Sequence, residues 1–494
     1  MKYFAVFFAV CAQVCSADVK FENRSDALPK HQYDGGWEHF VGGGIAVFDC
    51  NTDALPDIFA AGGENPAILL RNDGEFNFSS IALPRLTGVT GAYPIDVDAD
   101  GHLDLFVLRV GDNVILKGAP DCQFSIGSDL LDVPQADDWS TAFTAWWEDE
   151  TAPPVMAVGN YVDRSNEQGP FEACDTNVIL RAENGSYRRE ILRPGFCPLS
   201  ILAAKDARGR MALRLSNDRH YYVRDGFEQM WDIDQKRFLS EVDGWPTVSL
   251  WGMGIAGRDL NGDGRDEVML TSMGDQVLQF AQPDGSYQAA PFGLGTYAQR
   301  PHTGDDGRPS TGWHAEFGDV DNDGRADLFL AKGNVDQMPG MATRDPNNLL
   351  VQNADGTFAE VSLEAGVASM ARSRGAALAD FDGDGKLDLL VSNRRAPLEL
   401  YKNVSSEVGN WVKVDLRQTG GNRHAIGARI SVQTESGVQT VQNVIGGGHA
   451  GGQLLPRHFG LGAAETGLIT VDWPDGSQTT LQGHAGETHV IRKP

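Results

Sequence analysis

Basic residues and long apolar runs are both scarce in this 494-residue sequence. Lys and Arg together number 41 against 68 Asp and Glu, which gives a formal net charge of −27 at pH 7. Nucleic-acid binding needs a basic surface that displaces counterions, so this balance argues against a nucleic-acid partner. It suits solubility and the binding of divalent cations or cationic partners.

The one prominent apolar run lies at the N-terminus. "YFAVFFAVCAQV" follows Met1-Lys2 and is too short to span a membrane. Cys15-Ser16-Ala17 supplies small residues before Asp18, as at a signal-peptidase cleavage site. We therefore predict a signal peptide over residues 1–17, with the alternative of a buried N-terminal strand. The mature chain is expected to be secreted, extracellular or periplasmic, without a membrane span.

Cysteine is also scarce, with six residues, of which four lie beyond the predicted signal peptide. In an exported chain these four are candidates for disulfides. Cys174 and Cys197 lie 23 residues apart and flank one predicted hairpin, so they are the favoured pair. Cys50 and Cys122 would then pair with each other or stay free.

What the sequence has instead is an acidic motif that recurs. "DFDGDGKLDLLVSN" starts at Asp380, and similar stretches start at Asp319, Asp259 and Asp96. A further copy, "DCNTDALPDIFAAGG" from Asp49, has Ala in place of the motif's Gly. The starts at 49, 96, 259, 319 and 380 are separated by 47, 163, 60 and 61 residues. The gap of 163 holds two eroded copies near residues 147 and 206, which makes seven units.

Each unit supplies four short strands, which predicts an all-β chain with a seven-bladed β-propeller over residues 18–408. The seventh unit lacks its last strand, whereas Val19–Leu28 has a strand pattern without a loop of its own. We expect this N-terminal strand to complete the seventh blade and close the ring; the alternative is a linear solenoid. Residues 409–494 alternate like strands, as in "WVKVDL" and "LITVDW", and predict a small β-sandwich or barrel domain.

The acidic loops predict calcium sites. Carboxylates at positions 1, 3, 5 and 9 offer oxygen ligands, Gly at position 6 permits a sharp turn, and position 7 offers its carbonyl. An EF-hand needs Glu at position 12, where the loop at 380 has Val391 and the loops at 96, 259 and 319 also have apolar residues. Plain hairpin turns are the other alternative. The expected ligand positions are Asp49, Asn51, Asp53, Asp57, Asp96, Asp98, Asp100, His102, Asp104, Asp259, Asn261, Asp263, Arg265, Glu267, Asp319, Asp321, Asp323, Arg325, Asp327, Asp380, Asp382, Asp384, Lys386 and Asp388.

The repeated loops resemble the FG-GAP (VCBS) repeats of integrin α-chain propellers. "GNWVKVDLRQTGGNRHAIGARISVQTESG" from Gly409 and "HFGLGAAETGLITVDWPDGSQTT" from His458 look like an ASPIC/UnbV domain. A propeller followed by that domain is the layout of the cartilage acidic protein family. The resemblance implies extracellular calcium binding and protein interaction or adhesion, with no established catalytic residues to carry over. The loops themselves predict four or five Ca²⁺ ions, because those at 96, 319 and 380 are complete and those at 259 and 49 keep most of the ligand positions. The two eroded loops are expected not to bind calcium.

Other features invite weaker hypotheses. His424, His449 and His458 match no metal-ligand spacing and are expected at turns or at the surface, and "GGGHAGG" (446–452) is not a phosphate loop. Trp37, Trp139, Trp251 and Trp313 would either pack between blades or line one face of the ring. The polar insertion 300–316, with Arg372 and Arg374, is a candidate rim.

The leading hypothesis is a monomeric, secreted, calcium-stabilised module that binds an extracellular protein or glycan. The alternative is an enzyme that acts on extracellular polysaccharide with the propeller as its scaffold, with Asp305 or Glu316 as candidate acids. A dehydrogenase with a quinone cofactor is a more distant alternative.

Overall fold

A computed structural model describes residues 18–127, 133–134, 136–167, 170–218, 225–297, 307–336 and 338–494. The predicted signal peptide, residues 1–17, lies outside the described residues, as do residues 300–306 of the polar insertion, which include Asp305. No helix within the described ranges has the length and apolar character needed to cross a membrane.

Seven sheets, each with four antiparallel strands, make up the larger part of the fold in the described residues. Six of them use consecutive strands, of which one sheet gains a fifth, parallel strand, and the seventh takes its fourth strand from the N-terminal part of the chain. The first three are β2 (Ile45–Phe48), β3 (Asp57–Ala60), β4 (Ile68–Asn72), β5 (Phe78–Ile81); β6 (Val89–Ile95), β7 (Asp104–Arg109), β8 (Val114–Ala119), β9 (Gln123–Ile126); and β10 (Ser140–Trp146), β11 (Val155–Asn160), β12 (Asn177–Glu183), β13 (Ser186–Leu192). The next three are β14 (Pro198–Lys205), β15 (Met211–Asn217), β16 (Gln229–Asp232), β17 (Arg237–Phe238); β18 (Gly252–Arg258), β19 (Glu267–Ser272), β20 (Val277–Ala281), β21 (Tyr287–Ala289); and β22 (Gly312–Gly318), β23 (Asp327–Lys332), β24 (Asn348–Gln352), β25 (Phe358–Glu360). The seventh consists of β26 (Arg372–Ala379), β27 (Asp388–Arg394), β28 (Glu399–Asn403) and β1 (Phe21–Asn23).

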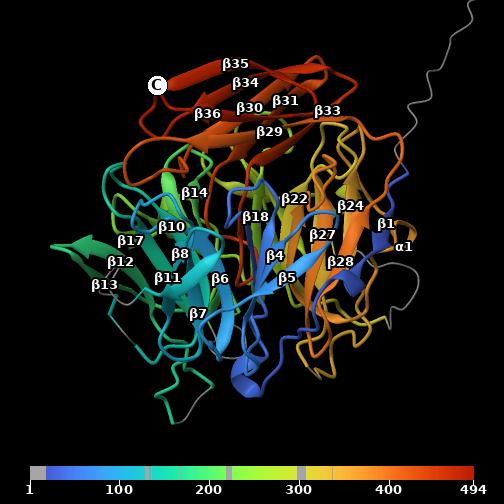
Figure 1. The fold of residues 1–494 in the computed structure, drawn as a ribbon. Coiled ribbons are helices and arrows are strands. Elements are labelled where there is room, and N and C mark those ends of the chain that lie inside the picture. The colour runs from blue at the N-terminus through green and yellow to red at the C-terminus, as the bar shows by residue number, and fades with distance from the viewer. Residues whose placement is uncertain are drawn as a thin grey trace, which may run out of the picture.

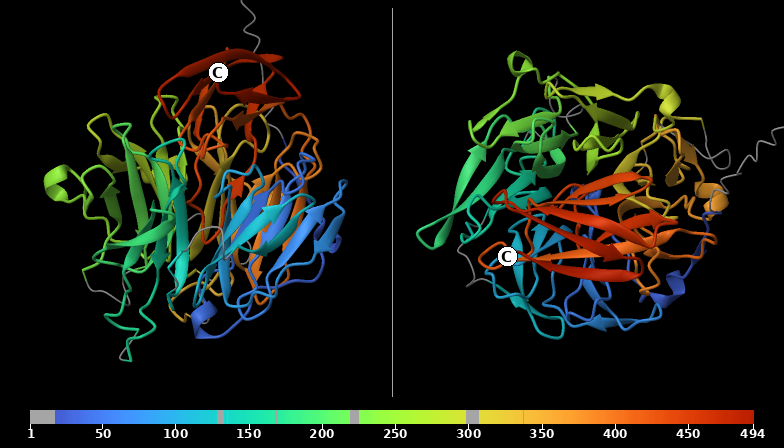
Figure 2. Two further views of the ribbon diagram at one scale, coloured as in Figure 1. Left: turned by 60° about the vertical axis from the view of Figure 1, so that its left-hand side comes forward. Right: turned by 90° about the horizontal axis from the view of Figure 1, so that it is seen from above.

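The seven sheets are the blades of a closed ring. Each innermost strand contacts the innermost strand of the next blade, in the order β2, β6, β10, β14, β18, β22 and β26, and β26 contacts β2 again. Figure 2 shows the blades around a common axis when the molecule is seen from above. The innermost strands are buried along almost their whole length because each packs between two neighbours, so they are apolar and rich in Gly and Ala.

Ring closure comes from the N-terminal strand, as the sequence predicts. β1 pairs antiparallel with β28, with Phe21 opposite Asn403 and Asn23 opposite Tyr401. Phe21 is buried in a cluster that also contains Leu389 of β27. A strand from the start of the chain therefore covers the edge that the end of the last unit would otherwise expose.

Residues 410–492 form two further sheets that pack on one end of the ring (Figure 1). One sheet contains β33 (Arg457–Gly462), β29 (Asn410–Arg417) and β36 (Glu487–Arg492). The other contains β31 (Gly437–Gln442), β30 (Arg429–Thr434), β34 (Thr466–Asp472) and β35 (Gln478–His484). Val412, Ile430, Phe459 and Trp473 share one buried cluster between the sheets, so the unit is a small β-sandwich.

The glycine-rich stretch of this second unit enters the centre of the propeller. We call residues 444–454 the axial segment; it contains the short strand β32 (Gln453–Leu454), which pairs parallel with β2. Further bridges join it to four other innermost strands, through Ala92, Ala145, Leu202 and Ile255. Figure 1 shows this part of the chain descending from the upper sheets into the ring. The end of the central channel that faces the sandwich is therefore filled by the protein's own backbone.

Close backbone approach explains two glycines of the inner strands. A Cβ atom at Gly91 would lie 1.6 Å from the Ala450 carbonyl oxygen, and one at Gly44 would lie 2.0 Å from the same atom. No side chain fits at such distances, so the inner strands are glycine-rich where the axial segment passes.

Two disulfides and a few short helices complete the fold. Cys174 pairs with Cys197, as favoured from the sequence, and Cys50 pairs with Cys122, which decides between the two alternatives left open for that pair. The helical elements are η1 (Ser25–Ala27), η2 (Trp37–His39), η3 (Glu241–Asp243), η4 (Phe292–Leu294) and α1 (Ser362–Ala365).

Candidate calcium loops

The five acidic loops occupy equivalent places in the ring. Each joins the first strand of a blade to the second, at the end of the ring that carries the β-sandwich. The acid at position 9 is always the first residue of the second strand: Asp57, Asp104, Glu267, Asp327 or Asp388. Blade geometry thus aligns residues from separate repeats at one face.

The position-9 carboxylate is held by backbone N–H groups. Asp104 Oδ2 accepts a hydrogen bond from the Val97 N–H at 2.9 Å, and its Oδ1 accepts one from the Gly118 N–H of β8 at 2.8 Å. Asp388 repeats both contacts with Phe381 and Asn403, at 2.9 and 2.8 Å. Asp57 and Asp327 follow the same pattern. The acid therefore links the loop to the second and third strands of its blade.

The position-1 carboxylate closes the loop. In all five loops its Oδ2 accepts a hydrogen bond from the N–H of position 6, at 2.8–3.1 Å. Position 6 has a positive φ in each, between 82° and 93° for the four glycines and 70° for Ala54. Glycine adopts this left-handed backbone without strain, so the motif's Gly follows from the turn, and Ala54 takes the same conformation at some cost.

In three loops the carboxylates converge on one point. One oxygen each from Asp96, Asp98 and Asp104 lie within 4.8 Å of one another, and the same holds for the trios listed next. These are Asp319, Asp321 and Asp327, and Asp380, Asp382 and Asp388. Three hard oxygen donors at this separation, beside a backbone turn, are the ligand set that Ca²⁺ prefers.

One oxygen in each of two of these carboxylates is left unsatisfied. Asp96 Oδ1 and Asp380 Oδ1 are buried and have no hydrogen-bond partner among the described residues. Burial raises the pKa of Asp104 to about 7 and that of Asp96 to about 6, and it raises the pKa of Asp388 well above its usual range. Buried carboxylates without partners are costly unless a positive charge lies among them, so the residues fit a divalent ion.

The other two acidic loops are less complete. At position 9 of the loop at 259, Glu267 Oε2 accepts the Leu260 N–H at 2.8 Å, and burial raises its pKa to about 7. Its acids, and the carboxylates of Asp49, Asp53 and Asp57, do not form a trio within 4.8 Å among the described residues. Asp57 instead lies beside the Cys50–Cys122 disulfide, whose sulfur atoms are not thiolate ligands.

Basic residues lie on the outer side of the loops. Lys117 of β8 contacts Asp98 and lies 3.1 Å from Asp100, while Lys402 of β28 contacts Asp382 and lies 3.5 Å from Asp384. Asp104 and Asp388 have no such partner among the ion pairs of the described residues. The ammonium groups thus offset one member of each trio, Asp98 or Asp382, but not the position-9 acid.

The β-sandwich packs directly on these loops. Lys413 Nζ of β29 lies 2.6 Å from Asp380 Oδ2, and His458 Nε2 lies 3.1 Å from the Gly385 carbonyl oxygen. Arg429 of β30 lies 3.0 Å from Asp266, and the Gly409 N–H donates to the Asp321 carbonyl at 2.8 Å. The candidate calcium loops therefore lie between the propeller and the second unit.

Sequence reasoning missed two asparagines that join neighbouring loops. Asn403 Nδ2, at the end of β28, donates to the Val320 carbonyl of the preceding blade's loop at 2.8 Å. Asn72 Nδ2, at the end of β4, donates to the Phe381 carbonyl at 2.7 Å. The recurrence of Asn at the end of the third strand, in "LLRN" and "LYKN", was the signal available.

The expectation for His449 was wrong. Its side chain is 0% exposed within the axial segment, its Nε2 accepts the Gly42 N–H at 3.2 Å, and its ring lies 5.0 Å from the Trp313 ring. His458 lies at the loop of Asp380, and His424 accepts from Arg417 Nη1 at 2.7 Å, with its pKa lowered to about 3 by burial. None of the three is an open surface histidine.

The remaining candidates divide between core and rim. Trp139 and Trp313 are buried, whereas Trp37 is 54% exposed at the far end of the ring. Arg374 is buried, with its guanidinium carbon 3.9 Å from the centre of the Trp313 ring. Glu316 contacts Gln453 of the axial segment and lies 3.4 Å from His314, and it lines a cleft of about 250 Å³ between the propeller and the β-sandwich.

Comparisons with known proteins agree with this architecture. Residues 49–107, 259–330 and 335–391 match the FG-GAP-like repeat, and residues 418–493 match the ASPIC and UnbV family. Cartilage acidic protein 1 of Homo sapiens is 28% identical over 177 residues, covering 35% of this chain and 26% of that protein. The Xenopus tropicalis protein of the same name is 26% identical over 259 residues, covering 51% of this chain and 38% of that protein. The matched regions are thus well under half the length of these curated relatives.

Solved structures that match this chain share little sequence with it. The crystal structure of BBS1N in complex with ARL6DN, soaked with mercury, is 11% identical, covers 78% of this chain and 97% of that chain, and has a TM-score of 0.47. The family expected from the motifs is confirmed by the sequence matches: this chain combines FG-GAP-like repeats with an ASPIC and UnbV domain and is a relative of cartilage acidic protein 1.

Proposed function

We propose that this chain is an extracytoplasmic interaction module whose propeller is stabilised by calcium. The observation that carries the proposal is the convergence of three aspartate trios in equivalent loops, two of them with a buried, unpartnered carboxylate oxygen. The two disulfides support an oxidising compartment, and the related curated proteins carry a name that places them in cartilage. The partner would be an extracellular protein or glycan, and adhesion is the form of function that the family resemblance favours.

Calcium would serve structure rather than chemistry in this arrangement. The proposed ligands are Asp96, Asp98 and Asp104 and their equivalents in the loops at 319 and 380. The same loops contact β29, β30 and the chain that leads into the sandwich. A bound cation would relieve carboxylate repulsion and hold both units together, so that a partner meets one rigid surface.

The test is calorimetric titration of chelator-treated protein with Ca²⁺, together with thermal unfolding. We expect at least three binding events and a rise in Tm. Asp98→Ala, Asp321→Ala and Asp382→Ala should each remove one event, because each substitution takes away one of the three carboxylates of a trio. Asp149→Ala, in an eroded loop, is the matched control and should change neither quantity. No heat of binding and an unchanged Tm would refute calcium binding.

Interaction would then be tested on extracellular-matrix proteins and a glycan array, with calcium and with chelator. The proposal expects binding that chelator weakens. Saturable turnover of a polysaccharide would instead favour the enzyme alternative.

A further inference from the structure

A pocket of about 480 Å³ opens at the end of the ring opposite the β-sandwich. We call it the distal pocket; Trp37, Phe40, Phe171, Met253, Met273 and Arg394 are among its lining residues. These residues lie before β2, at the start of β18, after β19, and at the end of β27, the ends away from the calcium loops. Its volume falls in the range of small-molecule sites.

Aromatic and thioether groups make one wall of the pocket. Trp37 stacks on Phe40 with ring centroids 4.8 Å apart, and Phe40 packs edge-on against Trp139 at 5.9 Å. Trp37 and Phe171 are 54% and 64% exposed, although both are large apolar side chains. Methionine side chains adapt their shape and contact aromatic rings favourably, so this wall suits a flat apolar ligand.

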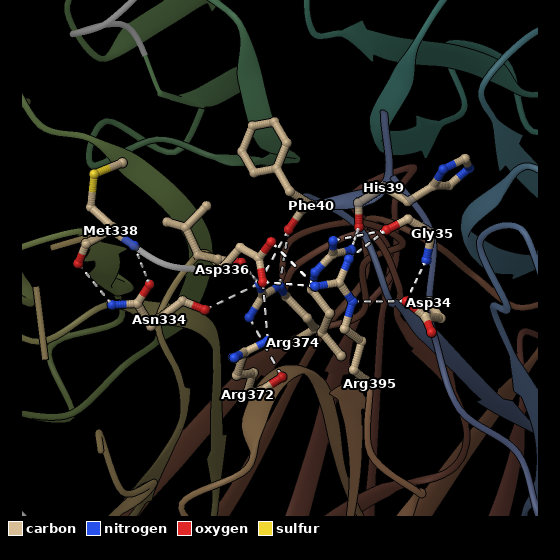
Figure 3. A network of polar contacts seen from close by, with 12 residues as sticks. Asp34, Gly35, His39, Phe40, Asn334, Asp336, Met338, Arg372, Arg374 and Arg395 are labelled. Carbon is tan, nitrogen blue, oxygen red and sulfur yellow. Dashed lines mark hydrogen bonds and ion pairs between the residues drawn. The ribbon is translucent and has the colours of Figure 1, made fainter. Parts of the chain in front are cut away.

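Four arginines crowd beside the pocket in a protein of net charge −27 (Figure 3). Arg372 and Arg395 both pair with Asp336, at 3.1 and 3.0 Å, and Arg395 also pairs with Asp34 at 2.9 Å. Arg374 donates only to backbone carbonyls, including that of Val335 at 2.6 Å. This like-charge crowding and burial lower the pKa of Arg374.

Of the two arginines that line the pocket, Arg394 is the one outside any ion pair of the described residues, since Arg395 pairs with Asp34 and Asp336. Arg394 lines the pocket, is buried, and donates to the carbonyl oxygens of His39 and Gly35, the latter at 2.9 Å. Its Nε atom has no hydrogen-bond partner, and no carboxylate lies within ion-pair distance of it among the described residues. A buried guanidinium in this condition is stabilised by an anion that reaches it.

The ion pairs of the lining residues limit that anion. Arg395 pairs with Asp336 and Asp34, while Asp218, which also lines the pocket, accepts a hydrogen bond from the Tyr161 hydroxyl at 2.5 Å. Arg394 is the lining guanidinium outside every ion pair of the described residues, and it lies next to the aromatic wall. We propose that the distal pocket binds a small aromatic monocarboxylate, with its ring against Trp37, Phe40 and the methionines and its carboxylate at Arg394.

The site is a blind pocket rather than a pore. The axial segment fills the channel from the other end, with His449 against Trp313, and Arg374 lies over the Trp313 ring. The pocket lies on the opposite end of the ring from the candidate calcium loops, so this proposal does not depend on the proposed function.

The experiment is calorimetric titration of the full chain, at a fixed saturating calcium concentration, with three probes of one shape. The probes are 2-naphthoate, the neutral 2-naphthalenemethanol and the cationic 2-naphthylmethylammonium. We expect 2-naphthoate to bind at least tenfold more tightly than either of the others. Equal affinity for the anion and the neutral probe, or no detectable binding of any probe at millimolar concentration, would overturn the proposal.

Variants locate the site. Arg394→Gln should abolish the preference for the anion, Arg394→Lys should restore part of it, and Trp37→Ala should weaken all three probes by at least threefold. Arg181→Gln, which breaks a surface ion pair with Glu148 on another blade, is the matched control and should change nothing. If Arg394→Gln fails to fold, two other variants are used to locate the site: Arg395→Gln, at an exposed position, and Trp37→Ala. Equal losses in Arg181→Gln and these variants would place the binding elsewhere.

Discussion

At the scale of single residues, the position-9 aspartate of four blades connects three strands. Asp104, for example, holds the loop after β6 and the end of β8 through two backbone hydrogen bonds. The same residue belongs to an aspartate trio. One side chain can thus serve the blade and the proposed cation together, which is why the acid recurs even in the less complete loops.

His449 gives a pH-dependent prediction. Burial lowers its pKa to about 3, against ~6.5 in an unfolded chain. The unfolded chain binds a proton below about pH 6.5 that the folded chain does not, so this residue's contribution to stability is lost as pH falls from about 6.5 toward 3. His449→Gln should make the fall in unfolding free energy between pH 6 and 4 shallower by about 1.4 kcal/mol per pH unit. Denaturant titrations at several pH values measure this, and parallel curves would contradict it.

Gly91 gives a steric prediction. A Cβ atom there would overlap the Ala450 carbonyl oxygen, so Gly91→Ala must displace the axial segment or the inner strand. We expect a loss of about 1–3 kcal/mol in unfolding free energy, as for other overpacked sites. Gly293→Ala, where the added atom would meet nothing within 4 Å, is the control. Equal stability of the two variants would mean that the axial segment does not lie as described.

At the scale of elements, β1 is the strand on which closure depends. It pairs with β28 over three residues, and its one buried side chain is Phe21. An unpaired β28 would present an open sheet edge, which promotes association with other chains.

Two substitutions in β1 test whether the packing of its buried side chain stabilises the closed ring. Phe21→Ala should cost about 3 kcal/mol of unfolding free energy and speed hydrogen exchange of the β28 amides, because it removes a buried ring from the closing strand. Glu22→Ala, an exposed position in the same strand, should leave both unchanged. If β28 exchange is the same in both variants, closure does not depend on β1.

At the scale of the whole molecule, the axial segment of the second unit lies in the propeller's interior. The axial segment bridges five innermost strands, and residues such as Ile445 and Leu454 belong to a propeller core cluster. The two units also share polar contacts at the candidate calcium loops. They are therefore expected to unfold together.

Removing the second unit tests this. A chain that ends at residue 408 loses the axial segment and uncovers the glycine-rich inner strands, so it should melt well below the full chain and aggregate more readily. Differential scanning calorimetry with saturating calcium compares the two. A truncated propeller that melts at the same temperature as the full chain would show that the axial segment contributes little.

Local patterns in the sequence were enough to predict the repeats, the four-strand units, ring closure by Val19–Leu28 and the favoured disulfide. These features depend on spacing, alternation and turn residues, which act over short stretches of chain. The acidic positions could be predicted for the same reason, and so could the loops that bring three carboxylates within 4.8 Å of one another, since those at 96, 319 and 380 have Asp at positions 1, 3 and 9. The loops at 49 and 259 have Asn51 and Asn261 at position 3 and form no such trio among the described residues.

The sequence by itself therefore determined the blades and the chemistry of their loops, because both follow from a local pattern that repeats along the chain. Only the tertiary structure decided where "GGGHAGG" goes, that His449 is buried, and that Arg394 faces an aromatic pocket. Those outcomes join residues that are 359 to 407 positions apart, and they depend on which backbones can approach one another once the ring has closed. No local pattern carries that information, since a glycine run signals close approach without naming its partner.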